Sequence, residues 1–170
     1  MLKIFQLRVA RSVTGIEVRE LALYLGISRT IISRWEKQPS FDEIKTKKIL
    51  PQSLLFFFKQ HNILFPDENS VKLNSHLQCL DSMHLNRFQL RASRAALGLT
   101  QEELGKLSNM PKTIINYLET KSNETLLNST NKDVDDLVFK DFFQKQGLSF
   151  PDSFTIRLKK SKPSCKFFIN

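Results

Sequence analysis

The sequence predicts a mainly helical protein built from two copies of one small unit, each copy ending in a short β-hairpin. Three observations support this fold class. The chain repeats itself, apolar residues recur at helical spacing through most of each copy, and short strand-like runs close each copy. The 170 residues suit one or two small domains, and a hydrophobic fraction of 41% is enough for compact cores.

The internal repeat extends over most of the chain. Residues 5–39 align without a gap on residues 88–122, at an offset of 83. Identical pairs include Phe5/Phe88, Gln6/Gln89, Leu7/Leu90, Arg8/Arg91, Arg11/Arg94, Gly15/Gly98, Glu20/Glu103, Leu21/Leu104, Thr30/Thr113, Ile31/Ile114, Ile32/Ile115 and Glu36/Glu119. The similarity resumes at an offset of 85, where each copy has Phe-Pro-Asp. We predict a first domain over 1–74, a second over 83–158, and a basic tail over 159–170.

The early helices of each copy have predictable ends. Thr100 and Glu103 form a capping box, in which the hydroxyl accepts from a backbone N–H and the carboxylate reaches back. Gly26 in the first copy and Asn109 in the second tolerate the left-handed conformation that ends this helix. The next helix begins at Ser28, a hydroxyl N-cap, and the equivalent helix of the second copy begins near a proline, Pro111, whose φ is already fixed.

Each copy closes with an amphipathic helix and a hairpin. The helices are predicted to stop at Asn62 and Gly147, and the hairpins to occupy 63–73 and 148–158. A lone two-stranded hairpin is marginal in water, so the two hairpins are expected to pair with each other or with a second chain. The run Phe56-Phe57-Phe58 exceeds what one helix stripe can bury, so one ring is expected to meet the other copy or another subunit. The expected core of the first copy comprises Leu7, Leu21, Leu25, Ile27, Ile32 and Trp35.

Residues 20–36 resemble the helix-turn-helix of the Cro/repressor family, which is also described as XRE-like or lambda repressor-like. The matching residues are Ala22, Gly26, Ser28, Ile32 and Glu36 in the first copy and Gln101, Gly105, Thr113, Ile115 and Glu119 in the second. The resemblance implies two tandem helix-turn-helix domains, each followed by a helix and a short β-hairpin. It also implies an internal ion pair between Arg11 and Glu36, repeated by Arg94 and Glu119.

The family places its second motif helix in the major groove of DNA, with the N-terminal residues at the base edges. The resemblance therefore implies recognition helices at about 28–36 and 111–119. The candidate DNA-binding residues are Arg29, Thr30, Ser33, Arg34 and Lys37, then Gln101, Lys112, Thr113, Asn116 and Tyr117. Arginine suits guanine, asparagine suits adenine, and lysine suits a phosphate or guanine, so the two copies are expected to prefer different half-sites.

The first motif helix differs between the copies. The family commonly places a glutamine against the DNA backbone, and Gln101 occupies this position in the second copy. The first copy has Val18 there, beside Arg19. The predicted recognition helix of the first copy thus has more basic side chains. The second copy has the residue that is more typical of the family at the contact with the DNA backbone.

The function predicted is a sequence-specific, double-stranded-DNA-binding transcriptional regulator of bacterial or phage type, located in the cytoplasm and at the nucleoid when bound. No enzyme activity, cofactor or metal is expected, because the chain has no phosphate loop, paired-carboxylate set or Cys/His constellation. No membrane span or secretory signal is expected either. Cys79 and Cys165 are expected to be free thiols.

Two alternatives concern partners. One or both copies could be protein-interaction modules of a co-regulator or antitoxin-like protein, with the second copy binding a protein instead of DNA. The chain could also form a homodimer through its hairpins or its exposed Phe residues. The net charge of +9 divides into +5 over 1–75, zero over 76–158 and +4 over the tail, which favours the first copy as the main DNA contact. The tail is either a disordered end or a phosphate-tracking arm.

Overall fold

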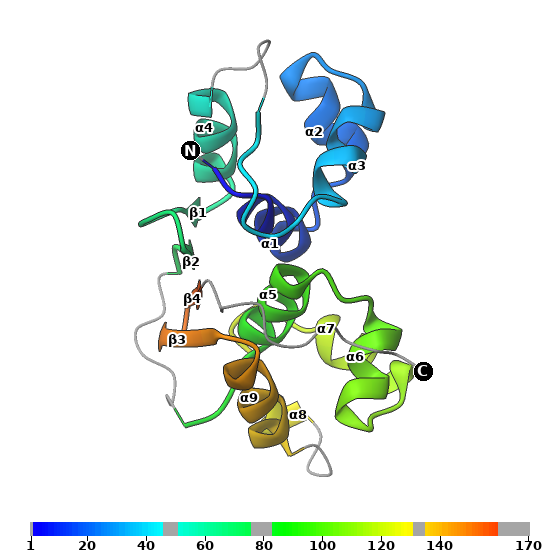
Figure 1. Cartoon of the computed structure of the whole chain (residues 1–170). Helices are drawn as coiled ribbons and strands as arrows, with labels where there is room; N and C mark the ends of the chain where they lie inside the picture. Colours follow the sequence, from blue (N-terminus) through cyan, green and yellow to red (C-terminus); the bar gives the residue numbers. More distant parts are fainter. Residues whose placement is uncertain (1, 46–50, 76–82, 131–134, 160–170) are drawn as a thin grey trace.

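The computed structural model describes residues 2–45, 51–75, 83–130 and 135–159, which form a mainly helical protein with one small antiparallel sheet (Figure 1). The first half contains α1 (Ile4–Thr14), α2 (Val18–Leu25), α3 (Arg29–Glu36), α4 (Pro51–Gln60), β1 (Ile63–Leu64) and β2 (Ser70–Leu73). The second half contains α5 (Arg87–Leu97), α6 (Gln101–Ser108), α7 (Lys112–Glu119), α8 (Leu127–Thr130), α9 (Asp136–Lys145), β3 (Leu148–Asp152) and β4 (Thr155–Leu158). The short helix α8 is the one element that the sequence did not predict. The two cysteines and the predicted tail beyond Lys159 lie outside the described residues.

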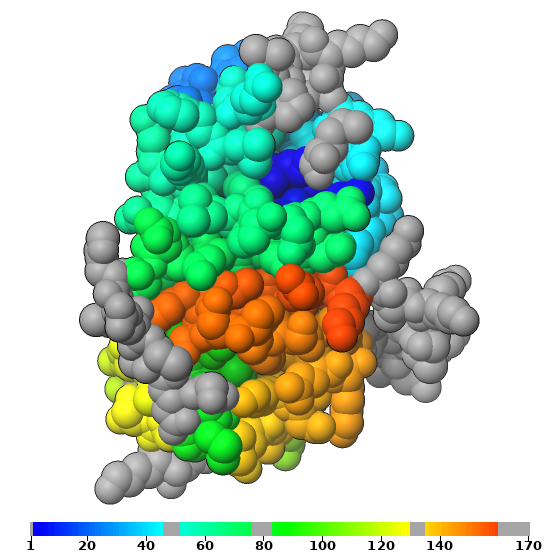
Figure 2. Space-filling view, turned by 90° about the vertical axis from the view of Figure 1, so that its left-hand side faces the viewer, coloured from blue at the N-terminus to red at the C-terminus, as the bar shows by residue number. Residues whose placement is uncertain are grey.

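The two predicted hairpins form and pair with each other. They build one four-stranded sheet in the order β1-β2-β4-β3, and β2 lies antiparallel to β4. Figure 2 shows the strands of the two halves as one continuous band across a face of the molecule. Of the two expected arrangements, the pairing within one chain is therefore the one observed.

The register between β2 and β4 is symmetrical about one residue pair. Val71 lies opposite Ile156, its counterpart at the offset of 85, while Ser70 faces Arg157 and Lys72 faces Thr155. Each strand thus presents the same positions to the other, as in an isologous interface between identical subunits. An approximate two-fold axis therefore passes between Val71 and Ile156.

Helices α1 and α5 pack against each other at the centre of the same arrangement. In Figure 1 they lie one above the other, with the strands on the left and both pairs of short helices on the right. Two ion pairs also cross between the halves, from Arg157 Nη2 to Asp67 Oδ2 at 3.1 Å and from Lys72 Nζ to Asp152 Oδ2 at 3.5 Å. The halves are therefore joined by the sheet, by helix packing and by matched charges.

Each hairpin is tied to the first helix of its own half. Gln6 donates its side-chain amide to the carbonyl oxygens of Asp67 at 2.8 Å and Ser70 at 3.0 Å. Gln89 donates in the same way to the Asp152 carbonyl at 3.3 Å. These bonds join the turn of each hairpin to the first helix of the same half. They give a structural reason for the repeated glutamine and for the repeated Phe-Pro-Asp.

The core contains most of the residues expected there. Leu7, Leu21, Ile32 and Trp35 are buried, while Leu25 and Ile27 are half-buried against the same cluster. In the aromatic run, Phe57 and Phe58 are buried and Phe57 packs on Tyr24, with ring centroids 4.5 Å apart. Phe56 is 57% exposed. The surplus ring of the run thus faces solvent in the described structure.

The predicted helix ends are largely confirmed. Thr100 Oγ1 accepts from the Glu103 backbone N–H at 3.1 Å, and Glu103 Oε2 accepts from the Thr100 N–H at 2.7 Å. Gly26 and Asn109 adopt the left-handed conformation, with φ of 65° and 53°. Ser28 occupies the N-cap position of α3, but its hydroxyl makes no capping bond, so the prediction of a hydroxyl cap there is wrong. The backbone alone forms that turn.

Candidate nucleic-acid interface

Two ion pairs fix the ends of α3 and α7 against the first helix of each half. Arg11 donates to Glu36 through Nε at 2.6 Å and through Nη2 at 2.8 Å. Arg94 and Glu119 repeat this two-point contact at 2.5 Å and 2.8 Å. Two parallel hydrogen bonds fix the orientation of the guanidinium group relative to the carboxylate, in addition to the attraction between their charges. The predicted internal pairs are present in both halves, and they hold the C-terminal ends of the two predicted recognition helices.

The outer face of α3 carries the five candidate residues of the first copy. The side chains of Arg29, Thr30, Ser33, Arg34 and Lys37 are all exposed. Their spacing places them along one side of the helix, opposite the buried Ile32 and Trp35. None of the five forms a side-chain hydrogen bond or ion pair with another described residue. Three cations on this stripe are therefore free to meet an external partner.

The equivalent face of α7 is less basic. Lys112, Thr113, Asn116 and Tyr117 are exposed at the positions that correspond to Arg29, Thr30, Ser33 and Arg34. Lys121 Nζ lies over the Tyr117 ring, 4.1 Å from its centroid, so this aromatic side chain already has a cationic neighbour. The two stripes occupy equivalent places but offer different hydrogen-bonding groups.

Gln101 is placed differently from the other candidates. Its side-chain amide donates to Glu119 Oε2 at 2.9 Å, and the residue is half-buried. Its amide nitrogen is thus used within the protein, in the same cluster as Arg94. The amide nitrogen carries two N–H groups, so one donor remains for an external acceptor such as a phosphate, alongside the amide oxygen.

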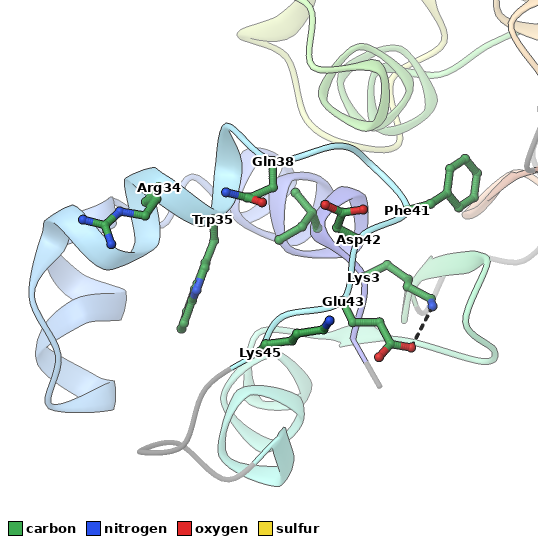
Figure 3. Close-up of a pocket in the computed structure, with 9 residues that line it drawn as sticks. Lys3, Arg34, Trp35, Gln38, Phe41, Asp42, Glu43 and Lys45 are labelled. Carbon is green, nitrogen blue, oxygen red and sulfur yellow. Dashed lines mark hydrogen bonds and ion pairs between the residues drawn. The ribbon is translucent and has the colours of Figure 1, made fainter. Parts of the chain in front are cut away.

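A pocket of about 640 Å³ opens beside the end of α3. Figure 3 shows Trp35 and Lys3 among its lining residues, while Arg34 extends away from the Lys3–Glu43 ion pair. That pair measures 3.0 Å, and the hydrogen bond from Lys3 lowers the pKa of Glu43 below its usual range. Because its walls carry charges of both signs, the pocket has no clear preference for an anion or a cation.

The sequence did not assign a role to Arg8 and Arg87, which the structure places at the C-terminal ends of α3 and α7. Arg8 Nη1 donates to the Glu36 carbonyl at 3.2 Å, and Arg87 Nε donates to the Glu119 carbonyl at 2.9 Å. Cations at a helix C-terminus satisfy the last carbonyls and the helix dipole. Arg8 aligns with Arg91 in the repeat, yet Arg87 occupies the end of the helix in the second half.

Comparisons of the chain with protein-family models, curated proteins and solved structures found no match. Within the described ranges, no group of His, Cys, Asp and Glu side chains is arranged to hold a metal ion. No described helix is both long enough and apolar enough to cross a membrane.

Proposed function

We propose that the chain is a sequence-specific, double-stranded-DNA-binding transcriptional regulator of the Cro/repressor type, with two helix-turn-helix units in one polypeptide. The observation that carries the proposal is the exposed stripe on α3. Five polar or basic side chains lie on one face with no partner in the described protein, while the opposite face and the C-terminal end of the helix are fixed. A rigid helix that presents unpaired donors suits the major groove.

The symmetry of the molecule supports the use of both halves. The approximate two-fold axis relates α3 to α7, and Figure 1 shows both helices on the side away from the sheet. Dimeric regulators of this type use a two-fold axis to place two recognition helices about one turn of DNA apart, ~34 Å. Here one chain would supply both helices. Because the stripes differ, the two half-sites of the operator would differ as well.

Selection of bound duplexes from a random pool tests this proposal. The expected result is an enriched sequence with base preferences in two short segments, bound at about 150 mM salt at least 10³-fold more tightly than a scrambled duplex. A control protein with Lys59→Ala removes an exposed cation on α4, outside the stripes, and should select the same sequence. A pool without enrichment, or binding that disappears at this salt, would contradict the proposal.

A second candidate function, binding of a partner protein, is favoured by an apolar surface on the first half. Leu23 is 75% exposed and Phe56 is 57% exposed, while their counterparts in the second half are Lys106 and Asp141. A groove of about 450 Å³ runs beside Leu23. The second half, which the sequence favoured for this role, also exposes apolar side chains, at Tyr117, Leu137 and Val138. Loss of a stable protein complex in a Leu23→Lys, Phe56→Asp variant, with DNA selection unchanged, would support this function alongside the first.

A further inference from the structure

A crevice of about 540 Å³ lies where the two halves meet. Its walls come from α1 and α5, from the two turns at 15–17 and 98–100, and from the end of α3, and they include two carboxylates, Glu17 and Glu36. Four arginines line it, two from each half: Arg8, Arg11, Arg91 and Arg94. Such a concentration of guanidinium groups is costly unless carboxylates or other acceptors compensate it.

Three of the four arginines have partners within the protein. Arg11 and Arg94 form the two-point ion pairs with Glu36 and Glu119. The terminal nitrogens of Arg8 donate to the Glu36 carbonyl, the Ser40 hydroxyl and the Ala96 carbonyl. The protein therefore provides acceptors for each of these three guanidinium groups, although the Nε of Arg8 is itself buried without one.

Arg91 is the exception. It is the counterpart of Arg8, but Arg87 caps α7 in its place, donating through Nε to the Glu119 carbonyl at 2.9 Å and through Nη1 to Asn123. No nitrogen of Arg91 forms a hydrogen bond or ion pair with any described residue, and its Nε is buried without an acceptor. Burial, together with the nearby Arg94, lowers the pKa of Arg91, although Glu119 acts against this shift. A half-buried cation is thus left unpaired.

The crevice also has unfilled space on one side of the two-fold axis. Arg8 packs on Gly98, where an added Cβ would lie 2.8 Å from Arg8 Nη1. At Gly15, the counterpart of Gly98, an added Cβ would have no neighbour within 4 Å. Arg91 therefore does not occupy the space that Arg8 fills on the other side.

We infer that this crevice is an anion site in which Arg91 binds a phosphate group, supported by the positive charge of Arg8 and Arg94. A guanidinium group can donate two parallel hydrogen bonds to the oxygens of a phosphate. A bound phosphate would therefore provide the acceptors that Arg91 lacks within the described protein. The phosphate could belong to a small phosphorylated molecule or to a DNA backbone. The site does not depend on the proposed function, because its first test uses the protein without DNA.

Thermal unfolding in the presence of pyrophosphate tests the site. The wild-type Tm should rise by about 5–10 °C when pyrophosphate is near 100-fold above its Kd, relative to sodium chloride of equal ionic strength. Arg91→Gln should abolish this rise, whereas Lys59→Gln, with the same change in charge on exposed α4, should retain it. In buffer without phosphate, Arg91→Gln should be at least as stable as the wild type, because it removes an unpaired charge. Equal responses of the three proteins would overturn the inference.

A second measurement needs no variant and identifies the source of the phosphate. The ³¹P resonance of pyrophosphate should broaden on addition of wild-type protein, and absence of broadening above that given by a lysozyme control of similar charge would overturn the site. Addition of a bound duplex then separates the two sources. Displacement of pyrophosphate by DNA assigns the site to a backbone phosphate, whereas retention of pyrophosphate in the complex assigns it to a small ligand. Either result supports the site itself.

Discussion

At the scale of residues, the repeat allows each side chain to be compared with its counterpart in the other half. Glu119 accepts two bonds from Arg94 and one from Gln101, and its side chain is 4% exposed. Glu36 accepts two bonds from Arg11 with its side chain 17% exposed. Water can therefore replace part of the lost interaction at Glu36 but little of it at Glu119.

Replacement of Glu119 by glutamine should accordingly be more damaging than the same change at Glu36. Glu119→Gln leaves the half-buried Arg94 without a counter-charge, and breaking a pair with a buried partner in this way costs up to about 3–5 kcal/mol of unfolding free energy. Glu36→Gln should cost less. Urea denaturation of both variants provides the measurement, and equal losses would argue against the difference in burial.

Arg29 and Lys112 occupy equivalent positions but should act differently on DNA. Arg29→Ala should weaken binding to the selected duplex by about 1–3 kcal/mol and relax base preference at one position. Lys112→Ala should mainly reduce the slope of log affinity against log salt, by about one unit, as expected for a phosphate contact. Gel-shift titrations at several salt concentrations measure both effects. If Arg29→Ala leaves the affinity for the selected duplex and its base preference unchanged, the first half does not recognise the DNA bases.

At the scale of elements, the start of α6 shows how local sequence fixes a helix end. Thr100 and Glu103 were predicted to form a capping box because a hydroxyl and a carboxylate three residues apart can each satisfy a backbone N–H, and the structure confirms this. The start of α2 has Glu17 in the equivalent position, with no side-chain cap. Local patterns thus predicted the capping bonds of α6, whereas the hydroxyl cap predicted at Ser28 does not form.

The capping box should make stability depend on pH in the acid range. Hydrogen bonds from Thr100, chiefly from its backbone N–H, lower the pKa of Glu103 below its ordinary value of 4.5. The ionised form is therefore favoured by folding, and its stabilisation is complete above about pH 4.5 and is lost as the pH falls through the lowered value. Urea midpoints from about pH 6 to about pH 3 should show that the difference between wild type and Glu103→Gln shrinks as the pH falls. A difference that stays constant over this range would contradict the role of the carboxylate.

Long-range contacts were the part of the fold and site that sequence patterns left open. The repeat predicted two similar halves and two hairpins, but the choice between pairing within the chain and pairing with a second chain needed the register of β2 on β4. Likewise, Arg8 and Arg91 align in the repeat, yet their side chains make different contacts. Their difference arises because Arg87 replaces Ile4 four residues earlier and takes the carbonyl at the end of α7. Which of two arginines reaches the carbonyl depends on how the helices pack, and the sequence pattern does not show this.

At the scale of the whole molecule, the two halves share structure that neither forms alone. β2 pairs with β4, α1 packs on α5, and ion pairs cross in both directions. The hairpins would each be marginal in isolation. The two halves are therefore expected to unfold together.

The single tryptophan offers a direct check of this coupling. Trp35 lies in the first half, so its fluorescence measures the unfolding of that half. Phe143→Ala removes a fully buried ring in the second half. This substitution should cost about 3–5 kcal/mol and shift the urea midpoint of Trp35 fluorescence as much as that of far-UV circular dichroism. An unchanged fluorescence midpoint would mean that the halves unfold independently.

The central claim is that one chain reads two unlike half-sites through α3 and α7. The most direct measurement is duplex selection run in parallel with the wild type, an Arg29→Ala, Arg34→Ala variant and a Lys112→Ala, Asn116→Ala variant. The wild type should select a sequence with two different halves, and each variant should lose base preference in one half only. Selection of no sequence, or loss of preference in the same half by both variants, would contradict the account.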